Sequence, residues 1–163
     1  PYTTLFRSNS APETVIRLLE MGLDPLNFAD ALICVLAQRL VRTLCQRCKE
    51  EYQASKEEID RLVHLYGEEI FGELGAELGS LSLCRPKGCD LCMGTGYKGR
   101  TGIHELLVGS KEMKKMIARS ATAEEIRQLA FQDGMRTLLQ DGIAKILNGD
   151  TDLDQLRRVT VED

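Results

Sequence analysis

The sequence contains no tryptophan, and aromatic residues make up only 5% of it. It also lacks a long apolar run, because the longest, at residues 31–37, is far short of the ~18 residues that cross a bilayer. No secretory signal peptide is recognisable at its start. The net charge of -4 and the pI near 5.3 argue against a protein that wraps nucleic acid by general electrostatic attraction. We therefore expect no membrane span, no secretion and no nucleic-acid partner.

What the sequence does contain is enough apolar material for a folded core. Hydrophobic residues make up 43% and charged residues 28% of the 163 positions. This length corresponds to one domain or two small ones, and this balance is typical of globular chains rather than disordered ones. With so few aromatic side chains, we expect an aliphatic core.

Residues 1–8 are set apart from the rest of the chain. They resemble the in-frame translation of a sequencing adapter fused to an incomplete gene, and the chain has no initiating Met. We expect an artefact here and exclude these residues from the fold. The alternative is an ordinary N-terminal strand.

Helix signals recur along the chain. Capping residues, a first-turn proline or an apolar face with helical spacing predict helices at 10–22, 24–33 and 55–66, and further helix starts at 110, 122 and 151. An apolar face formed by Met135, Leu138, Leu139, Ile143, Ile146 and Leu147 predicts another helix, ending at Gly149. Residues 36–44 fit a helix or a strand equally well, and 103–108 are a predicted strand. Between 67 and 80 we expect a loop or a frayed helix.

The strongest signal is a set of four cysteines in two Cys-x-x-Cys pairs, Cys45 with Cys48 and Cys89 with Cys92. Each pair can present two sulfurs to one ion from a tight turn, so two pairs complete the tetrahedral site that Zn²⁺ prefers. Closing the 40-residue segment between the pairs costs about 3 kcal/mol. A structural zinc site contributes on the order of 10–16 kcal/mol, which offsets this cost. Four thiolates leave no open position, so we predict a structural and not a catalytic site.

Five basic residues near the pairs in sequence are expected to balance the charge of a zinc tetrathiolate: Arg47, Lys49, Lys87, Lys98 and Arg100. Three alternatives to zinc are a redox-active pair, two disulfides in an oxidising compartment, and a nucleic-acid zinc ribbon, whose pairs usually lie ~15–20 residues apart. The remaining cysteines are expected to be bystanders. Cys34 is interpreted as a small buried hydrophobe in a helical run, and Cys84 as a spectator.

Residues 94–101 nearly match the phosphate-loop pattern G-x-x-x-x-G-K-S/T, but we interpret the match as a decoy. Arg100 replaces the lysine that reaches the phosphates, and a cysteine turn precedes the segment where a strand is required. The glycines are better suited to tight turns beside a metal. The second cysteine pair also resembles one zinc repeat of the J-domain co-chaperones, which carry four such repeats.

Several segments together resemble one family, the hexameric ATPases of type II secretion (the general secretion pathway protein E family) and type IV pilus assembly. The matching stretches are 9–11, 17–22, 36–42, the Cys45 pair, 88–103, 134–138 and 156–160. The resemblance runs from about residue 9 to residue 163. The sequences of residues 37–45 and 134–138 resemble the type II secretion branch more closely.

The resemblance implies an α/β fold: the C-terminal part of a RecA-like P-loop ATPase core, with a tetracysteine zinc subdomain and an all-α C-terminal domain. The expected boundaries are 9–44 for the core, 45–100 for the zinc subdomain, 101–109 for a returning strand and 110–163 for the helical domain. The parent would be a homohexamer that hydrolyses ATP with Mg²⁺. It would act with inner-membrane platform proteins at the cytoplasmic face of the inner membrane, associating with the membrane only indirectly.

The resemblance also implies that the catalytic elements of the parent lie upstream of this fragment, so no catalytic residue is assigned and the nucleotide contacts are unknown. Asn9 is the last trace of the family's histidine box, and Gln38 and Arg39 lie near the nucleotide-binding core without a catalytic role. His104 stands where the family often has Tyr and is expected to be a packing variant. His64 is expected at the surface of its helix.

A second hypothesis is a freestanding zinc-dependent protein-interaction module without ATPase activity. Under either hypothesis we expect one zinc ion per chain at Cys45, Cys48, Cys89 and Cys92. We expect Cys89→Ser to loosen residues 45–92 while the C-terminal helices keep their structure. We also expect residues 9–44 to expose a large apolar surface when most of the core sheet is missing.

Overall fold

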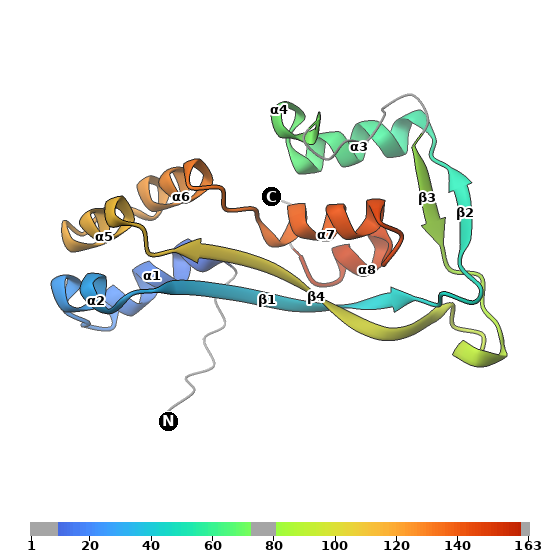
Figure 1. Cartoon of the computed structure of the whole chain (residues 1–163), viewed down its shortest axis with the longest axis horizontal. Helices are drawn as coiled ribbons and strands as arrows, with labels where there is room; N and C mark the ends of the chain where they lie inside the picture. Colours follow the sequence, from blue (N-terminus) through green and yellow to red (C-terminus); the bar gives the residue numbers. More distant parts are fainter. Residues whose placement is uncertain (1–9, 73–80, 161–163) are drawn as a thin grey trace. The chain divides into compact units, whose positions relative to one another are not determined.

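The computed structural model describes residues 10–72 and 81–160 (Figure 1). The predicted artefact at 1–8, the assignment of Asn9 and most of the predicted loop at 67–80 lie outside these residues. The chain divides into two compact units. Unit 1 runs to Gln38 and resumes at His104–Thr137, and unit 2 comprises Arg39–Ile103 and the segment from Leu138 onward.

Unit 1 contains the four helices α1 (Ala11–Glu20), α2 (Pro25–Ala31), α5 (Lys111–Ala118) and α6 (Ala123–Gln132). Each begins where the sequence predicted, because a polar side chain at the N-cap accepts a backbone N–H of the first turn; the caps are Ser10, Asp24, Ser110 and Thr122. In α2 the predicted end at residue 33 is wrong. The helix stops at Ala31 because Leu32 already has an extended backbone.

The core of unit 1 is aliphatic, as expected. Val15, Met113, Ile117 and Ile126 are fully buried where the four helices meet, and Leu107 joins them. Met135 also belongs to this core. Its predicted place on the helix ending at Gly149 is therefore wrong, because that helix starts only at Leu138.

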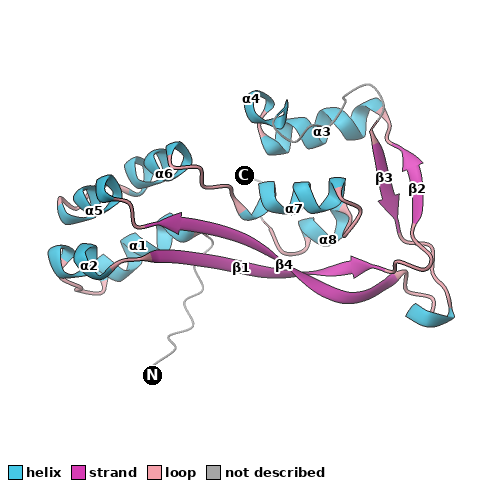
Figure 2. Cartoon of the chain, viewed as in Figure 1, coloured by secondary structure: helices cyan, strands magenta, loops and turns pink. Residues whose placement is uncertain are grey.

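Two long strands, β1 (Cys34–Leu44) and β4 (Tyr97–Val108), form a two-stranded sheet (Figure 2). The ambiguous segment 36–44 is thus a strand, and the predicted strand at 103–108 is the end of a longer one. Cys34 starts β1 and is exposed. Its interpretation as a buried hydrophobe in a helix is wrong, because the helical run ends before it.

Unit 2 contains a small antiparallel sheet and two groups of helices (Figures 1 and 2). β2 (Glu50–Gln53) pairs with β3 (Ser82–Arg85). α3 (Lys56–Tyr66) and α4 (Glu68–Phe71) follow β2, while α7 (Leu138–Leu147) and α8 (Leu153–Arg157) come from the end of the chain. The capping box predicted for α3 is present: the Ser55 side chain accepts from Glu58, and the Glu58 side chain accepts from Ser55.

One core joins these two sequence regions of unit 2. Leu62 of α3 and Leu83 of β3 are buried in the same cluster as Ile143 and Ile146 of α7 and Leu156 of α8. At Gly142 a side chain would collide with Leu156, so α7 and α8 pack closely. The described residues 110–160 form the helices α5 to α8. These helices are divided between the two units, with α5 and α6 in unit 1 and α7 and α8 in unit 2.

The end of α7 fits its predicted glycine stop, whereas the start of α8 does not fit its prediction. Gly149 lies two residues after the end of α7 and has a φ of +70°, as is typical of a glycine that terminates a helix. The cap of α8 is Asp152 and not the predicted Thr151. Thr151 is instead buried, and its hydroxyl donates to the carbonyl of Arg42 in β1. Across the described ranges, no helix is long and apolar enough to cross a membrane.

Candidate metal centre

The first cysteine pair lies in a tight turn at the end of β1. The N–H groups of Cys48 and Lys49 both donate to the carbonyl of Cys45, at 3.1 and 2.8 Å. The turn returns the chain into β2, so both sulfurs of the pair are presented on one side. We call this turn the first knuckle (residues 45–49).

The second pair lies in a similar turn, which we call the second knuckle (residues 86–100). Cys89 precedes the short 3-10 helix η2 (Asp90–Cys92), and the N–H groups of Cys92 and Gly94 donate to the Cys89 carbonyl at 3.2 and 2.9 Å. Met93 has a left-handed backbone with a φ of +53°. Gly88 is required here because a Cβ would lie 2.6 Å from the carbonyl oxygen of Gly94.

The four predicted ligands come together. All four Sγ atoms lie within 4.8 Å of one another. The Sγ of Cys89 is 3.9 Å from that of Cys45 and 3.8 Å from that of Cys92, and the sulfurs of Cys48 and Cys92 are 3.8 Å apart. A tetrahedron with Zn–S bonds of about 2.3 Å has edges of about 3.8 Å. The donor set and its spacing therefore fit a Zn²⁺ ion with four thiolate ligands.

Backbone N–H groups aimed at one sulfur favour its thiolate form. The N–H groups of Cys89 and Gly96 donate to the Cys92 Sγ at 3.1 and 3.2 Å. Burial raises the pKa of Cys92, but these hydrogen bonds outweigh it and lower the pKa to about 6. At Cys48, desolvation and the neighbouring sulfurs raise the pKa to about 12. The thiols of Cys48 and Cys92 thus differ in pKa, and a divalent ion would supply the charge that favours four thiolates.

The two knuckles are tied to each other by the backbone. The N–H of Cys45 donates to the carbonyl of Gly96 at 2.8 Å. Gly96 has a φ of +77°, and a Cβ there would collide with the ring of Pro86. Gly96 thus holds one sulfur through its N–H and the other knuckle through its carbonyl, which only a glycine can do in this conformation.

Unit 2 anchors the metal centre to the turn between α7 and α8. The Lys49 ammonium group donates to the carbonyl of Gly149 at 2.9 Å, and the N–H of Leu44 donates to that of Asp150 at 2.8 Å. Tyr97 lies in the second knuckle, and its hydroxyl donates to the Asp152 carboxylate. The guanidinium group of Arg42 lies 5.1 Å from the centre of the Tyr97 ring. These contacts connect the knuckles to the segment that starts α8.

The five basic residues expected to balance a zinc tetrathiolate have different surroundings. Lys49 binds Gly149, and Lys87 pairs with Glu50, whose hydrogen bond raises the pKa of the lysine. The other three, Arg47, Lys98 and Arg100, are exposed on the knuckles. Cys84, the predicted spectator, is half-buried in β3 and outside the four-sulfur cluster.

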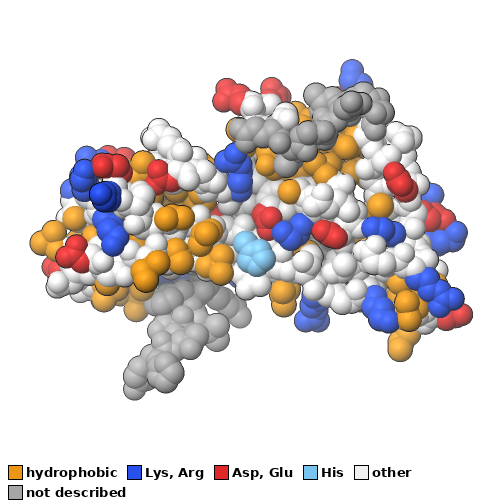
Figure 3. Space-filling model, viewed as in Figure 1, with side chains coloured by type: hydrophobic (Ala, Val, Ile, Leu, Met, Phe, Trp, Pro, Cys, Tyr) orange, Lys and Arg blue, Asp and Glu red, His pale blue; other side chains and the backbone are white. Residues whose placement is uncertain are grey.

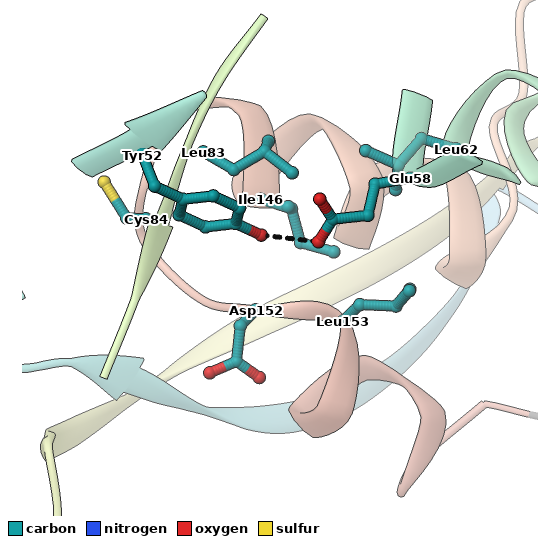
Figure 4. Close-up of a pocket in the computed structure, with 8 residues that line it drawn as sticks. All are labelled: Tyr52, Glu58, Leu62, Leu83, Cys84, Ile146, Asp152 and Leu153. Atoms are coloured by element: carbon teal, nitrogen blue, oxygen red, sulfur yellow. Dashed lines mark hydrogen bonds between the residues drawn. The ribbon is translucent and has the colours of Figure 1, made fainter. Parts of the chain in front are cut away.

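A small pocket in unit 2 was not predicted from the sequence (Figure 4). Its polar groups are Tyr52, whose hydroxyl donates to Glu58 at 2.8 Å, and Asp152. Burial and the Glu58 hydrogen bond raise the pKa of Tyr52 to about 12. Both carboxylates also cap helices: Glu58 accepts from Ser55 at the start of α3, and Asp152 from Gln155 in α8. The capping pattern at Ser55 and Glu58 is the one sequence signal for this pocket.

The other residues considered from the sequence are not among the four clustered cysteines. Gln38 is exposed and Arg39 half-buried in β1, His104 is exposed on β4, and His64 is exposed on α3 as predicted. The decoy phosphate loop at 94–101 forms a turn and the first half of β4. No helix follows it, as a phosphate loop would require.

A model of the family described as type II/IV secretion system protein matches residues 2–158. Among curated relatives, the type IV pilus assembly ATPase PilB of Thermus thermophilus is 42% identical over 95% of this chain and 16% of its own length. The type II secretion system protein E of Aeromonas hydrophila is 38% identical over 96% of this chain and 29% of its own length. The type II secretion system ATPase E of Vibrio cholerae is 38% identical over 95% of this chain and 28% of its own length. The chain thus spans less than a third of each of these relatives.

Proposed function

Because this chain belongs to the type II/IV secretion system protein family, we propose that it is part of a longer ATPase that drives protein secretion or pilus assembly. The match over residues 2–158 is the observation that carries this proposal, and the relatives named ATPases support it. The parent would bind ATP and Mg²⁺, form a homohexamer and work with platform proteins at the cytoplasmic face of the inner membrane. Its membrane association would be indirect, through these partners.

We prefer the type II secretion branch because the sequences of residues 37–45 and 134–138 resemble that branch more closely. The relatives do not separate the branches, since pilus and secretion ATPases match at 42% and 38% identity over nearly the same share of the chain. Complementation separates them: the restored parent gene should rescue secretion in a strain lacking its type II ATPase. Rescue of piliation alone would assign the pilus branch.

Within the parent, this part of the chain would supply a structural zinc site at Cys45, Cys48, Cys89 and Cys92. Three of their sulfur–sulfur distances are 3.8–3.9 Å and all lie within 4.8 Å, which supports zinc as the metal. We propose residues 9–44 as the end of the RecA-like core, 45–100 as the zinc subdomain, 101–109 as the returning strand and 110–163 as the helical domain. The zinc would hold the knuckles in place and take no part in phosphoryl transfer, because four cysteine ligands leave it no open position.

Two experiments test the proposal. The genomic sequence upstream of residue 9 should encode a G-x-x-x-x-G-K-S/T motif within a few hundred residues; an open frame without one would leave a freestanding zinc module. The purified chain should contain one zinc ion by elemental analysis and should show no ATP hydrolysis. Turnover by the pure chain would show that the catalytic elements are misplaced in this account.

A further inference from the structure

The metal-binding knuckles present a surface with an unusual combination of side chains. Two aliphatic side chains of the second knuckle lie in solvent: Met93 is 90% exposed and Leu91 is 45% exposed. Four basic residues of the same two turns are exposed: Lys87, which pairs with Glu50, and Arg47, Lys98 and Arg100. We call these two aliphatic and four basic residues the knuckle surface. In Figure 3, basic and hydrophobic side chains lie side by side at this end of unit 2.

The charge of the knuckles is opposite to that of the rest of the chain. Residues 45–49 and 86–100 contain five basic residues and one acidic residue, a net charge of +4. The whole chain has a net charge of -4, so the remaining residues together carry -8. A zinc ion with four thiolates would bring -2 and leave the knuckles at about +2. The knuckle surface is therefore expected to attract negatively charged partners and to repel positively charged ones.

The knuckle surface is also held rigid before any partner arrives. The second knuckle is fixed by the hydrogen bonds from Gly94 to Cys89 and from Gly96 to Cys92, and the N–H of Cys45 joins the first knuckle to it. Met93 is held in its left-handed conformation by this turn, with its own N–H donating to the Asp90 carbonyl. A preformed loop with an exposed apolar tip loses little conformational entropy on binding.

We propose that the knuckle surface docks an acidic polypeptide segment of a partner protein, with Met93 and Leu91 as the apolar anchors. The basic side chains would pair with the partner's carboxylates around these anchors, an arrangement common at protein interfaces. The position of Asp90 favours a protein over a lipid surface. Asp90 is exposed and directly precedes Leu91 in the sequence, so an anionic membrane would repel its carboxylate, whereas a protein partner can offer it a hydrogen-bond donor.

The test places the photo-crosslinking residue benzoylphenylalanine at position 93 of the protein in the cells that produce it. The matched control carries it at position 21 of unit 1, where Met21 is 63% exposed. We expect crosslinks at position 93 to one protein, through a peptide rich in Asp and Glu, and not at position 21. No crosslink at position 93, or the same products at both positions, would overturn the proposal.

Charge reversal tests the electrostatic part. Lys98→Glu together with Arg100→Glu should lower the crosslinking yield at least about tenfold, while Lys111→Glu in unit 1 should leave it unchanged. Reversing acidic residues of the crosslinked peptide should restore the yield. Zinc content measured for each variant shows that the knuckles remain folded.

A lipid surface is the competing outcome. Vesicles of 70% phosphatidylcholine and 30% phosphatidylglycerol should not retain the chain in a sedimentation assay at 150 mM salt. Retention that the same charge reversal abolishes would overturn the proposal in favour of a membrane. Because these measurements do not involve ATP or secretion, they can fail while the proposed function stands.

Discussion

Loss of one ligand from the metal centre should unfold unit 2 and leave unit 1 folded. The perturbation is Cys89→Ser, with Cys34→Ser as the matched control because Cys34 is exposed and outside the four-sulfur cluster. This expectation differs from the one drawn from the sequence, in which the C-terminal helices keep their structure. In the structure α7 and α8 share a core with α3 and β3, and Lys49 binds the carbonyl of Gly149 at the end of α7.

The expected magnitude follows from the size of the metal term. Zinc binding to four cysteines is worth on the order of 10–16 kcal/mol, of which about 3 kcal/mol closes the segment between the pairs. A whole domain is usually stable by only about 5–15 kcal/mol. If the four sulfurs hold zinc, its loss should therefore remove as much free energy as keeps a whole domain folded, and unit 2 should unfold.

Hydrogen exchange measured by mass spectrometry, together with elemental analysis, is the assay. Wild type and Cys34→Ser should each hold one zinc ion and protect all helices. Cys89→Ser should lose the zinc and the protection of α3, α7 and α8, while α1, α2, α5 and α6 stay protected. If α7 and α8 keep their protection while residues 45–92 lose theirs, the shared core does not couple them and the reasoning is wrong.

Three further predictions concern single side chains. Gly96→Ala should destabilise unit 2 by at least about 1 kcal/mol more than Gly94→Ala in urea unfolding, because both have positive φ but only at Gly96 does a Cβ meet other atoms; equal losses would contradict this. Glu105 is 3% exposed, and its carboxylate accepts a hydrogen bond from the N–H of Ala11 at 2.6 Å. Glu105→Gln should therefore destabilise unit 1 by about 1–2 kcal/mol. As a control, Glu112→Gln at an exposed position should change the stability of unit 1 by less than about 0.5 kcal/mol. Burial and the Asp152 hydrogen bond raise the pKa of Tyr97 to about 12 from its ordinary 10. The contribution of the neutral hydroxyl to the stability of unit 2 is therefore fully present below pH 10 and is lost as the pH rises through 12. Tyr97→Phe should therefore be about 1 kcal/mol less stable than wild type at pH 8. This difference should shrink as the pH rises above 10 and reverse in sign above pH 12, because the ionised tyrosine is disfavoured in the folded state; a constant difference would show that Tyr97 does not titrate this way.

The local features of this fold were predictable because each depends on a few neighbouring residues. Ser10, Ser55, Ser110 and Thr122 cap helices that start where the sequence indicated. The grouping of the four cysteines was also predictable. Its chemistry lies in the spacing within each cysteine pair, and the structure brings the two pairs together across 40 residues.

The features that depend on distant partners were not predictable. Residues 36–44 have no decisive period, and they form a strand because β4 pairs with them. The first half of β4 was not predicted as a strand because it contains Gly99 and Gly102, and glycine weakens a strand pattern. Cys34 and Met135 were misplaced because both helices are shorter than the apolar patterns suggest. α2 ends before Cys34, and α7 starts after Met135. The sharing of the last helices between two units follows from packing that no local pattern records.

The central claim is that four sulfurs hold one zinc ion, and X-ray absorption at the zinc edge of the purified chain tests it most directly. We predict four Zn–S distances of about 2.3 Å and no nitrogen or oxygen in the first coordination shell. A first shell with nitrogen or oxygen ligands, or protein purified under reducing conditions without zinc, would contradict it.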